Sequence, residues 1–242
     1  ATWSSEVSAI SMGNNVAPYH GRFVIDSTNG RIWFSWFMTS TVGGGSTPYY
    51  NMSVAYLRLS DEHFYSVDGF DLGTGINLTV ASHCVVIDTD SSAQLFSTVR
   101  INSLGYPYLV YKNVDNSFKF IKWNGSAWVG PYTVYAGSLT QYSHDFRLID
   151  DSNLEAYVVD SNDTISNSSP LLKKCTSSDS GVTWSYSTVF TGDYAHGFAD
   201  PEFPLNFTTG FKLYIPSRTD ITIDGTLKAI DTTDQLIGIL TD

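Results

Sequence analysis

The stretch SSDSGVTW, residues 177–184, reads Ser-x-Asp-x-Gly-x-Thr-Trp and is the most informative segment of the sequence. Its polar residues and glycine are typical of a tight turn, and the aromatic and β-branched residues around it are typical of strands. Residues 123–128, WNGSAW, are a degenerate copy, so that Trp128 corresponds to Trp184. Both segments continue as a second strand that ends at a glycine. The stretch therefore predicts a β-hairpin that recurs along the chain.

Short strands extend this pattern over most of the 242 residues. Helical periodicity is hard to find, and about twenty aromatic or β-branched runs are separated by Gly, Asn, Asp and Ser. Four segments share one layout, a short apolar strand, a polar turn and a more aromatic strand; they begin at Arg22, Thr98, Phe146 and Phe203. Groups of four antiparallel strands that recur every ~45–60 residues predict the blades of a β-propeller.

A histidine-led segment also recurs, and it bears on the number of blades. It contains His20, His83, His144 and His196. Counting by these histidines gives four blades, whereas the number of strands favours five, with residues 83–96 as the remnant of an additional blade. Either count predicts a single all-β domain over residues 1–242, closed into a ring by the N-terminal strand.

The chain resembles the Asp-box (BNR-repeat) β-propellers, a broad group that includes sialidases and certain polysaccharide lyases. The resemblance implies that Asp179 accepts hydrogen bonds from the amides of its own turn and that Trp184 packs between blade edges. The box is then structural; its residues are Ser177, Asp179, Gly181, Thr183 and Trp184. Residues 197–218 are similar to an inner strand of five-bladed glycoside-hydrolase propellers, which adds a carbohydrate-active enzyme to the expectations.

Ligands of propellers bind where the inner strands begin, at the mouth of the central channel. The candidate ligand-binding residues on or near these strands are His20, Arg22, Arg147, Arg218, Tyr49 and Tyr50. Tyr49 and Tyr50 end a Gly/Ser-rich segment, which favours a mobile binding loop. Asp26, Asp88 and Asp150 are expected only to end strands before turns.

An enzyme would use Asp200, Glu202, His196 and His144. Glycoside hydrolysis needs two carboxyl groups about 5–9.5 Å apart, and a lyase needs a base such as Tyr or His. A sialidase is disfavoured because its Arg-Ile-Pro opening is missing. No complete catalytic set can be assigned, so whether the chain is an enzyme stays open.

The net charge of −11 excludes nucleic acid and anionic membranes as favoured partners. No apolar run approaches the ~20 residues of a membrane-spanning helix. No cofactor and no metal are expected, and a structural zinc site is disfavoured because a C-x-x-C or Cys/His cluster is absent. The alternative is that the recurring histidines ring a metal on the propeller axis. Cys84 and Cys175 form either one disulfide or two buried free thiols.

Six Asn-x-Ser/Thr sequons favour an extracellular, glycosylated surface. They lie at Asn51, Asn77, Asn124, Asn162, Asn167 and Asn206. We therefore expect a secreted or surface-displayed propeller that binds glycans or acts as an assembly module of an extracellular or virion surface. The alternative is a glycoside hydrolase or polysaccharide lyase with its site at the channel mouth. The sequence leaves a homo-oligomer or larger assembly open.

Overall fold

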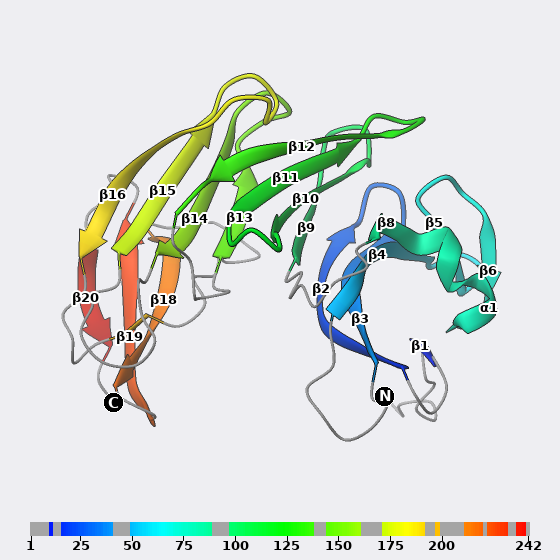
Figure 1. The fold of residues 1–242 in the computed structure, drawn as a ribbon, viewed down its shortest axis with the longest axis horizontal. Helices are drawn as coiled ribbons and strands as arrows, with labels where there is room; N and C mark the ends of the chain where they lie inside the picture. The colour runs from blue at the N-terminus through cyan, green and yellow to red at the C-terminus, as the bar shows by residue number, and fades with distance from the viewer. Residues whose placement is uncertain are drawn as a thin grey trace. The chain divides into compact units, whose positions relative to one another are not determined.

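A computed structural model describes residues 10–11, 16–40, 49–88, 97–137, 144–160, 171–191, 197–198, 211–219, 222–231 and 236–240. Within these ranges the chain is almost entirely β-structure (Figure 1). The one α-helix among them, α1, has four residues. This agrees with the expected all-β class.

Contacts between residues divide the chain into two compact units. The first is Ala1–Val114 with Lys122–Val129, and the second is Asp115–Ile121 with Gly130–Asp242. The elements up to the end of β10 are β1 (Ile10–Ser11), β2 (Val16–Asp26), β3 (Arg31–Ser40), β4 (Tyr49–Arg58), β5 (His63–Ser66), β6 (Asp71–Gly73), β7 (Ile76–Asn77), α1 (Leu78–Ala81), the 3-10 turn η1 (Ser82–Cys84), β8 (Val85–Asp88), β9 (Ser97–Ile101) and β10 (Pro107–Lys112).

The remaining strands are β11 (Phe118–Trp123), β12 (Trp128–Tyr135), β13 (His144–Leu148), β14 (Leu154–Asp160), β15 (Leu171–Ser177), β16 (Ser185–Thr191), β17 (Gly197–Phe198), β18 (Phe211–Thr219), β19 (Thr222–Asp231) and β20 (Leu236–Leu240). Most strands lie in sheets in which strands consecutive in sequence are neighbours, whereas β1 pairs in parallel with β7 in a separate two-stranded sheet. The first sheet has the order β2-β3-β4-β5-β6, with β8 also paired to β4. The second (β9–β12), third (β13–β16) and fourth (β17–β20) sheets have four strands each.

The first sheet is larger than a four-stranded blade because residues 67–88 fold onto it. Its α1-facing side contains Trp36, Met38, Ala55 and Phe64, packed against residues of this insertion that include Cys84. The expectation that residues 83–96 begin a separate blade is wrong for the part described. His83 lies in η1, and β8 pairs with β4 within the first sheet.

Of the two alternatives for the cysteines, the structure shows the free thiols. Cys84 and Cys175 are free, buried thiols. The physical reason is enclosure: Cys84 belongs to the apolar cluster of the first sheet, and Cys175 is fully buried in β15. Burial raises the pKa of each thiol to about 12, so both stay protonated and unreactive near neutral pH.

The second and third sheets contact each other at a glycine within the second unit. The Phe120 ring of β11 lies 5.8 Å from the Trp184 ring and 6.4 Å from the Phe146 ring, centroid to centroid. A Cβ atom at Gly181 would overlap the Phe120 ring, and Gly181 has a φ of +86°. Glycine is therefore required there for its conformation and for its lack of a side chain.

We predict that Gly181→Ala lowers the free energy of unfolding more than Gly69→Ala does. Gly69 has a similar φ of +88°, but no atom lies within 4 Å of the position that a Cβ atom would take there. Its substitution should lower the free energy of unfolding only through the strain of a left-handed backbone at a residue with a Cβ atom, about 1–2 kcal/mol. Gly181→Ala should lose a further ~1–3 kcal/mol through overpacking against Phe120. Urea denaturation of the two variants measures the difference, and equal losses would contradict the close packing on Phe120.

Candidate functional site

In the first three sheets, one end of the sheet is held together by side-chain oxygens. In a four-stranded meander, the turn between the first and second strands lies at the same end as the turn between the third and fourth. In the third sheet these two turns are linked directly, because the Ser180 amide donates to the Ser152 carbonyl at 2.8 Å. In the first sheet the Leu59 amide donates to the Gly30 carbonyl at 2.9 Å.

The SSDSGVTW turn shows how this end is built. Asp179 Oδ1 accepts hydrogen bonds from the Val182 amide at 3.1 Å and the Thr183 amide at 2.9 Å, and Asp179 Oδ2 accepts from the Thr183 hydroxyl at 2.6 Å. The Gly181 amide donates to Ser177 Oγ at 2.9 Å, and Trp184 Nε1 donates to the Gly181 carbonyl at 2.9 Å. The Thr183 hydroxyl and amide, with the Ser177 hydroxyl, lower the pKa of Asp179 to about 2. Both carboxylate oxygens of Asp179 thus accept hydrogen bonds from within their own turn.

The corresponding turns of the first and second sheets are also capped by a side-chain oxygen. In the second sheet Asn124 Oδ1 accepts from the Ser126 and Ala127 amides, each at 2.9 Å. In the first sheet Asp61 Oδ1 accepts from the His63 amide at 3.3 Å. A side-chain oxygen thus caps the third-to-fourth-strand turn in three sheets.

The turns between first and second strands repeat the arrangement. Asp26 accepts from the Asn29 amide at 3.1 Å, Asn102 from the Tyr106 amide at 2.8 Å, and Asp150 from the Asn153 amide at 2.8 Å. Asp26 therefore ends β2, as the sequence indicated, and Asp150 lies in the turn two residues after β13 ends. Asp88 ends β8 and is exposed.

The opposite end of the third sheet holds His144 and its neighbour Asp145, at the start of β13. Both side chains are buried. The His144 ring packs 4.8 Å from the Phe118 ring, and Asp145 Oδ1 accepts from the Phe146 amide at 2.7 Å. In this geometry neither side chain faces solvent, where a substrate would have to be met.

Arg147 binds a neighbouring carboxylate. Its Nε lies 2.8 Å from Glu155 Oε2, and Lys174 Nζ lies 2.8 Å from Glu155 Oε1. This cross-strand group ties β13, β14 and β15 together on one face. Arg22, the other arginine predicted to bind a ligand whose side chain is described, is half-buried in β2 opposite Ser35.

The functional roles assigned from the sequence to the remaining site residues stay predictions. His20, Tyr49 and Arg218 lie in β2, β4 and β18, and Tyr50 follows Tyr49, but their side chains are outside the description. His196, Asp200 and Glu202 lie outside the described residues, as do Asn162, Asn167 and Asn206.

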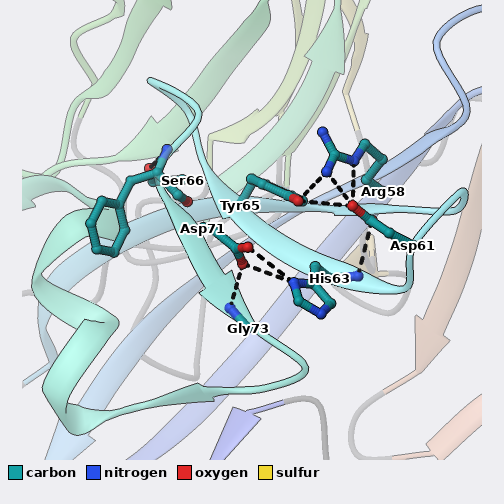
Figure 2. Close-up of polar contacts among 8 residues, drawn as sticks. Arg58, Asp61, His63, Tyr65, Ser66, Asp71 and Gly73 are labelled. Atoms are coloured by element: carbon teal, nitrogen blue, oxygen red, sulfur yellow. Dashed lines mark hydrogen bonds and ion pairs between the residues drawn. The ribbon is translucent and has the colours of Figure 1, made fainter.

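A polar network on β4, β5 and β6 was not anticipated from the sequence (Figure 2). Arg58 Nε donates to Asp61 Oδ2 at 2.8 Å, and the Tyr65 hydroxyl donates to the same oxygen at 2.9 Å. The Arg58 guanidinium carbon lies 4.1 Å from the centroid of the Tyr65 ring. His63 Nδ1 is 3.0 Å from both carboxylate oxygens of Asp71.

The network lies on the side of the first sheet opposite α1. Trp33, Tyr56 and Tyr65 are neighbours in register there, with ring centroids 4.6 Å and 5.4 Å apart. This aromatic row supports Arg58 and fixes its plane. The only sequence signal was the alternation of Asp61, His63 and Tyr65 after the turn, which places His63 and Tyr65 on one face of a strand.

The chemistry available here is hydrogen bonding. Hydrogen bonding from Arg58 holds the pKa of Asp61 well below its ordinary value, and the Gly73 amide, followed by His63, lowers the pKa of Asp71. Both carboxylates are therefore ionised acceptors at neutral pH. Figure 2 shows the second ring nitrogen of His63 turned away from Asp71, and a third of the His63 side chain is exposed, at 37%. The group can offer a fixed imidazole nitrogen and a carboxylate to the hydroxyl groups of a ligand.

Among the described residues, no group of three or more His, Cys, Asp or Glu side chains is arranged to hold a metal ion. The described part of the chain contains no helix long and apolar enough to cross a membrane.

Comparison with known proteins identifies a fold but no family. No protein-family model matches the chain, and no curated protein matches it. An ulvan lyase of polysaccharide lyase family PL25, bound to a glucuronic acid–sulfated rhamnose saccharide, is similar at 15% identity with a TM-score of 0.64, over 89% of this chain and 51% of the lyase chain. This chain thus spans about half the length of that lyase.

Two further structures resemble the chain. A GH43 β-1,3-galactosidase with galactodeoxynojirimycin has 11% identity and a TM-score of 0.55, over 98% of this chain and 81% of its own. Cobalt-substituted ACO of Synechocystis has 8% identity and a TM-score of 0.50, over 90% of this chain and 48% of its own. The glycan-active neighbours are of the propeller type. At these identities the likeness shows the fold alone, an all-β arrangement of antiparallel sheets.

We predict that Asp179→Asn removes part of the acid sensitivity of folding. The folded pKa of about 2 lies below the ordinary value of 3.8, so the ionised carboxylate stabilises the fold above about pH 4 and loses this effect as the pH falls towards 2. Asparagine keeps a side-chain oxygen that accepts from backbone amides, as Asn124 does in the second sheet. The difference in Tm between wild type and variant should narrow from about pH 4 to pH 2. A difference that stays constant with pH would contradict the assigned role.

Proposed function

We propose that this chain is a propeller-type module that binds glycans through exposed polar side chains. The observation that carries the proposal is the structural likeness to a glycan lyase and a galactosidase, over 89% and 98% of the chain. The Arg58–Asp61–Tyr65 and His63–Asp71 network is the described surface that suits this role. Its groups are held by paired contacts, and a preorganised group loses less entropy when it binds a sugar hydroxyl.

At the described network, binding is preferred to catalysis because its carboxyl groups are held in the ionised form. A glycosidase needs one carboxylic acid with a raised pKa. Asp61, Asp71, Asp150 and Asp179 all have lowered pKa values. These four are acceptors that hold turns or neighbouring side chains.

A carbohydrate-active enzyme remains the second candidate, because the lyase and the galactosidase are both enzymes. Its residues would be Asp200, Glu202 and His196. His144 would take part only if the Phe118 ring that packs against it moved away. A polysaccharide lyase or glycoside hydrolase built this way would act at the channel mouth.

We also propose that the sheets are blades of one closed ring of the Asp-box type. Apart from the two-stranded β1–β7 sheet, the described residues supply four sheets of four or more strands, so a fifth blade would need residues outside them. Support comes from equivalent positions. Val99 of β9, three residues before the turn residue Asn102, is 0% exposed, whereas the corresponding Phe23 of β2, three residues before Asp26, is 58% exposed. An apolar inner strand of this kind needs a covering sheet, and ring closure by the last sheet would supply it.

A secreted or surface-displayed location belongs to the same proposal. Asn77 and Asn124 are exposed and therefore accessible sequons, while Asn51 lies within β4, opposite Met38 and Asp88. A role as an assembly module of an extracellular or virion surface, in one or several copies, is compatible with this location.

Substitution of Phe23 tests ring closure. In a closed ring, Phe23→Ala should lower the free energy of unfolding by an amount approaching that of Phe146→Ala, about 3–5 kcal/mol. Phe146→Ala is the matched control, since its ring is already fully buried. A change within about 0.5 kcal/mol for Phe23→Ala, as at ordinary surface sites, would contradict closure. Equilibrium urea denaturation measures both.

A glycan-array screen of the full chain, with assays for new reducing ends and unsaturated products, tests the function. We expect binding without turnover. His63→Ala and Asp71→Asn should weaken it at least about threefold, because each removes a hydrogen-bonding partner. His83→Ala is the control, an exposed histidine stacked on Phe70 at 3.9 Å. Absence of binding to every glycan would contradict the proposal, and product formation would replace it with the enzyme.

A further inference from the structure

An exposed tyrosine on the outer strand of the third sheet is held in a fixed orientation. The Tyr186 side chain of β16 is 59% exposed. The ring of the buried Tyr135 meets it edge to face, with centroids 4.8 Å apart and planes at 90°. Tyr135 is itself anchored, because its hydroxyl donates to Asp160 Oδ2. A large apolar ring is therefore presented to solvent with little freedom to move.

A lysine lies beside this ring. Lys173 Nζ is 6.0 Å from the Tyr186 ring centroid and donates to Thr188 Oγ1 at 2.7 Å. Lys173 and Thr188 are opposite each other in register on β15 and β16, so the contact follows from the sheet. An ammonium group has three N–H donors, and two of them remain for other acceptors.

Lys173 differs from Lys174 and Arg147 of the second unit in its ion pairing. Lys174 is paired with Glu155 at 2.8 Å, and Arg147 with the same carboxylate at 2.7 Å. Among the residues that the structure describes, Lys173 has no carboxylate within ion-pair distance. In a chain with a net charge of −11, a cation of this kind beside an exposed aromatic ring is a local site for an anion.

The second sheet contains a matched arrangement without this property. Lys119 of β11 donates to Thr133 Oγ1 of β12 at 2.9 Å, the same cross-strand contact as in the third sheet. There Asp115 lies 3.5 Å from Lys119 Nζ and neutralises it. The repeat thus provides one neutralised and one uncompensated copy of the same Lys–Thr pair.

We propose that Tyr186 and Lys173 form a subsite for an anionic pyranose, a uronate or a sulfated sugar. The apolar face of the sugar ring stacks on Tyr186, and the carboxylate or sulfate accepts a hydrogen bond from Lys173 Nζ. Aromatic contact supplies area at low entropic cost, and the charge-assisted hydrogen bond selects the anion. The inference rests on the proposed glycan binding and adds a substrate class and a second binding surface.

Titration calorimetry of the full chain with glucuronic acid oligosaccharides, sulfated oligosaccharides and neutral oligosaccharides tests the subsite. Tyr186→Ala and Lys173→Gln should each weaken binding of an anionic glycan by about 3- to 10-fold. Tyr186→Phe, which keeps the ring, and Lys119→Gln, the matched control, should leave it within about twofold. Wild-type affinity for the anionic glycan should also fall with added salt. Comparison of the uronate and sulfate ligands shows which anion is preferred.

The outcomes separate this inference from the proposed function. If the wild type binds an anionic glycan and Lys173→Gln and Tyr186→Ala bind it equally well, the subsite is wrong while glycan binding stands. If the wild type binds only neutral glycans, the anionic class is wrong. If it binds none, the proposed function fails first. Thermal unfolding of each variant identifies any loss that comes from misfolding.

Discussion

The fold depends on one recurring interaction, the capture of backbone amides by a side-chain oxygen at a strand turn. Asp179, Asn124 and Asp61 perform it between third and fourth strands, and Asp26, Asn102 and Asp150 between first and second strands. A turn of this kind leaves amide donors that no strand can satisfy, and each hydrogen bond from such an amide to a side-chain oxygen contributes about 0.5–1.5 kcal/mol. With these donors satisfied locally, these six turns have a defined reversal and the strands on either side acquire a defined register.

Register then determines what the faces of the sheets carry. In the third sheet it places Arg147 opposite Glu155, and Lys173 opposite Thr188. In the first sheet it aligns Trp33, Tyr56 and Tyr65 and brings Arg58 over the last of these rings. At the turn ends of the second and third sheets these side-chain oxygens are used in structural contacts, whereas in the first sheet the turn residue Asp61 also belongs to the Arg58–Tyr65 network. Fold alone does not specify the ligand, which depends on these side chains.

The hairpins and the SSDSGVTW turn could be predicted from the sequence because their signals are local: turn residues at fixed offsets and short β-branched runs. The place of His83 could not, since residues 67–88 fold onto the first sheet through an apolar cluster with no periodic signature. The pairing of Arg147 with Glu155 and the His63–Asp71 contact also escaped, because both join strands whose register a sequence does not state. The free cysteines were one of two alternatives, decided by enclosure in apolar surroundings.

Hydrogen exchange of the turn amides tests the central claim most directly. The Val182, Thr183, Ser126, Ala127 and Asn153 amides belong to exposed residues or polar turns, yet each donates to a side-chain oxygen. If these hydrogen bonds hold the hairpins, the five amides exchange far more slowly than solvated turn amides of the same chain. Exchange at the rate of an unstructured peptide would show that the oxygens do not hold the turns.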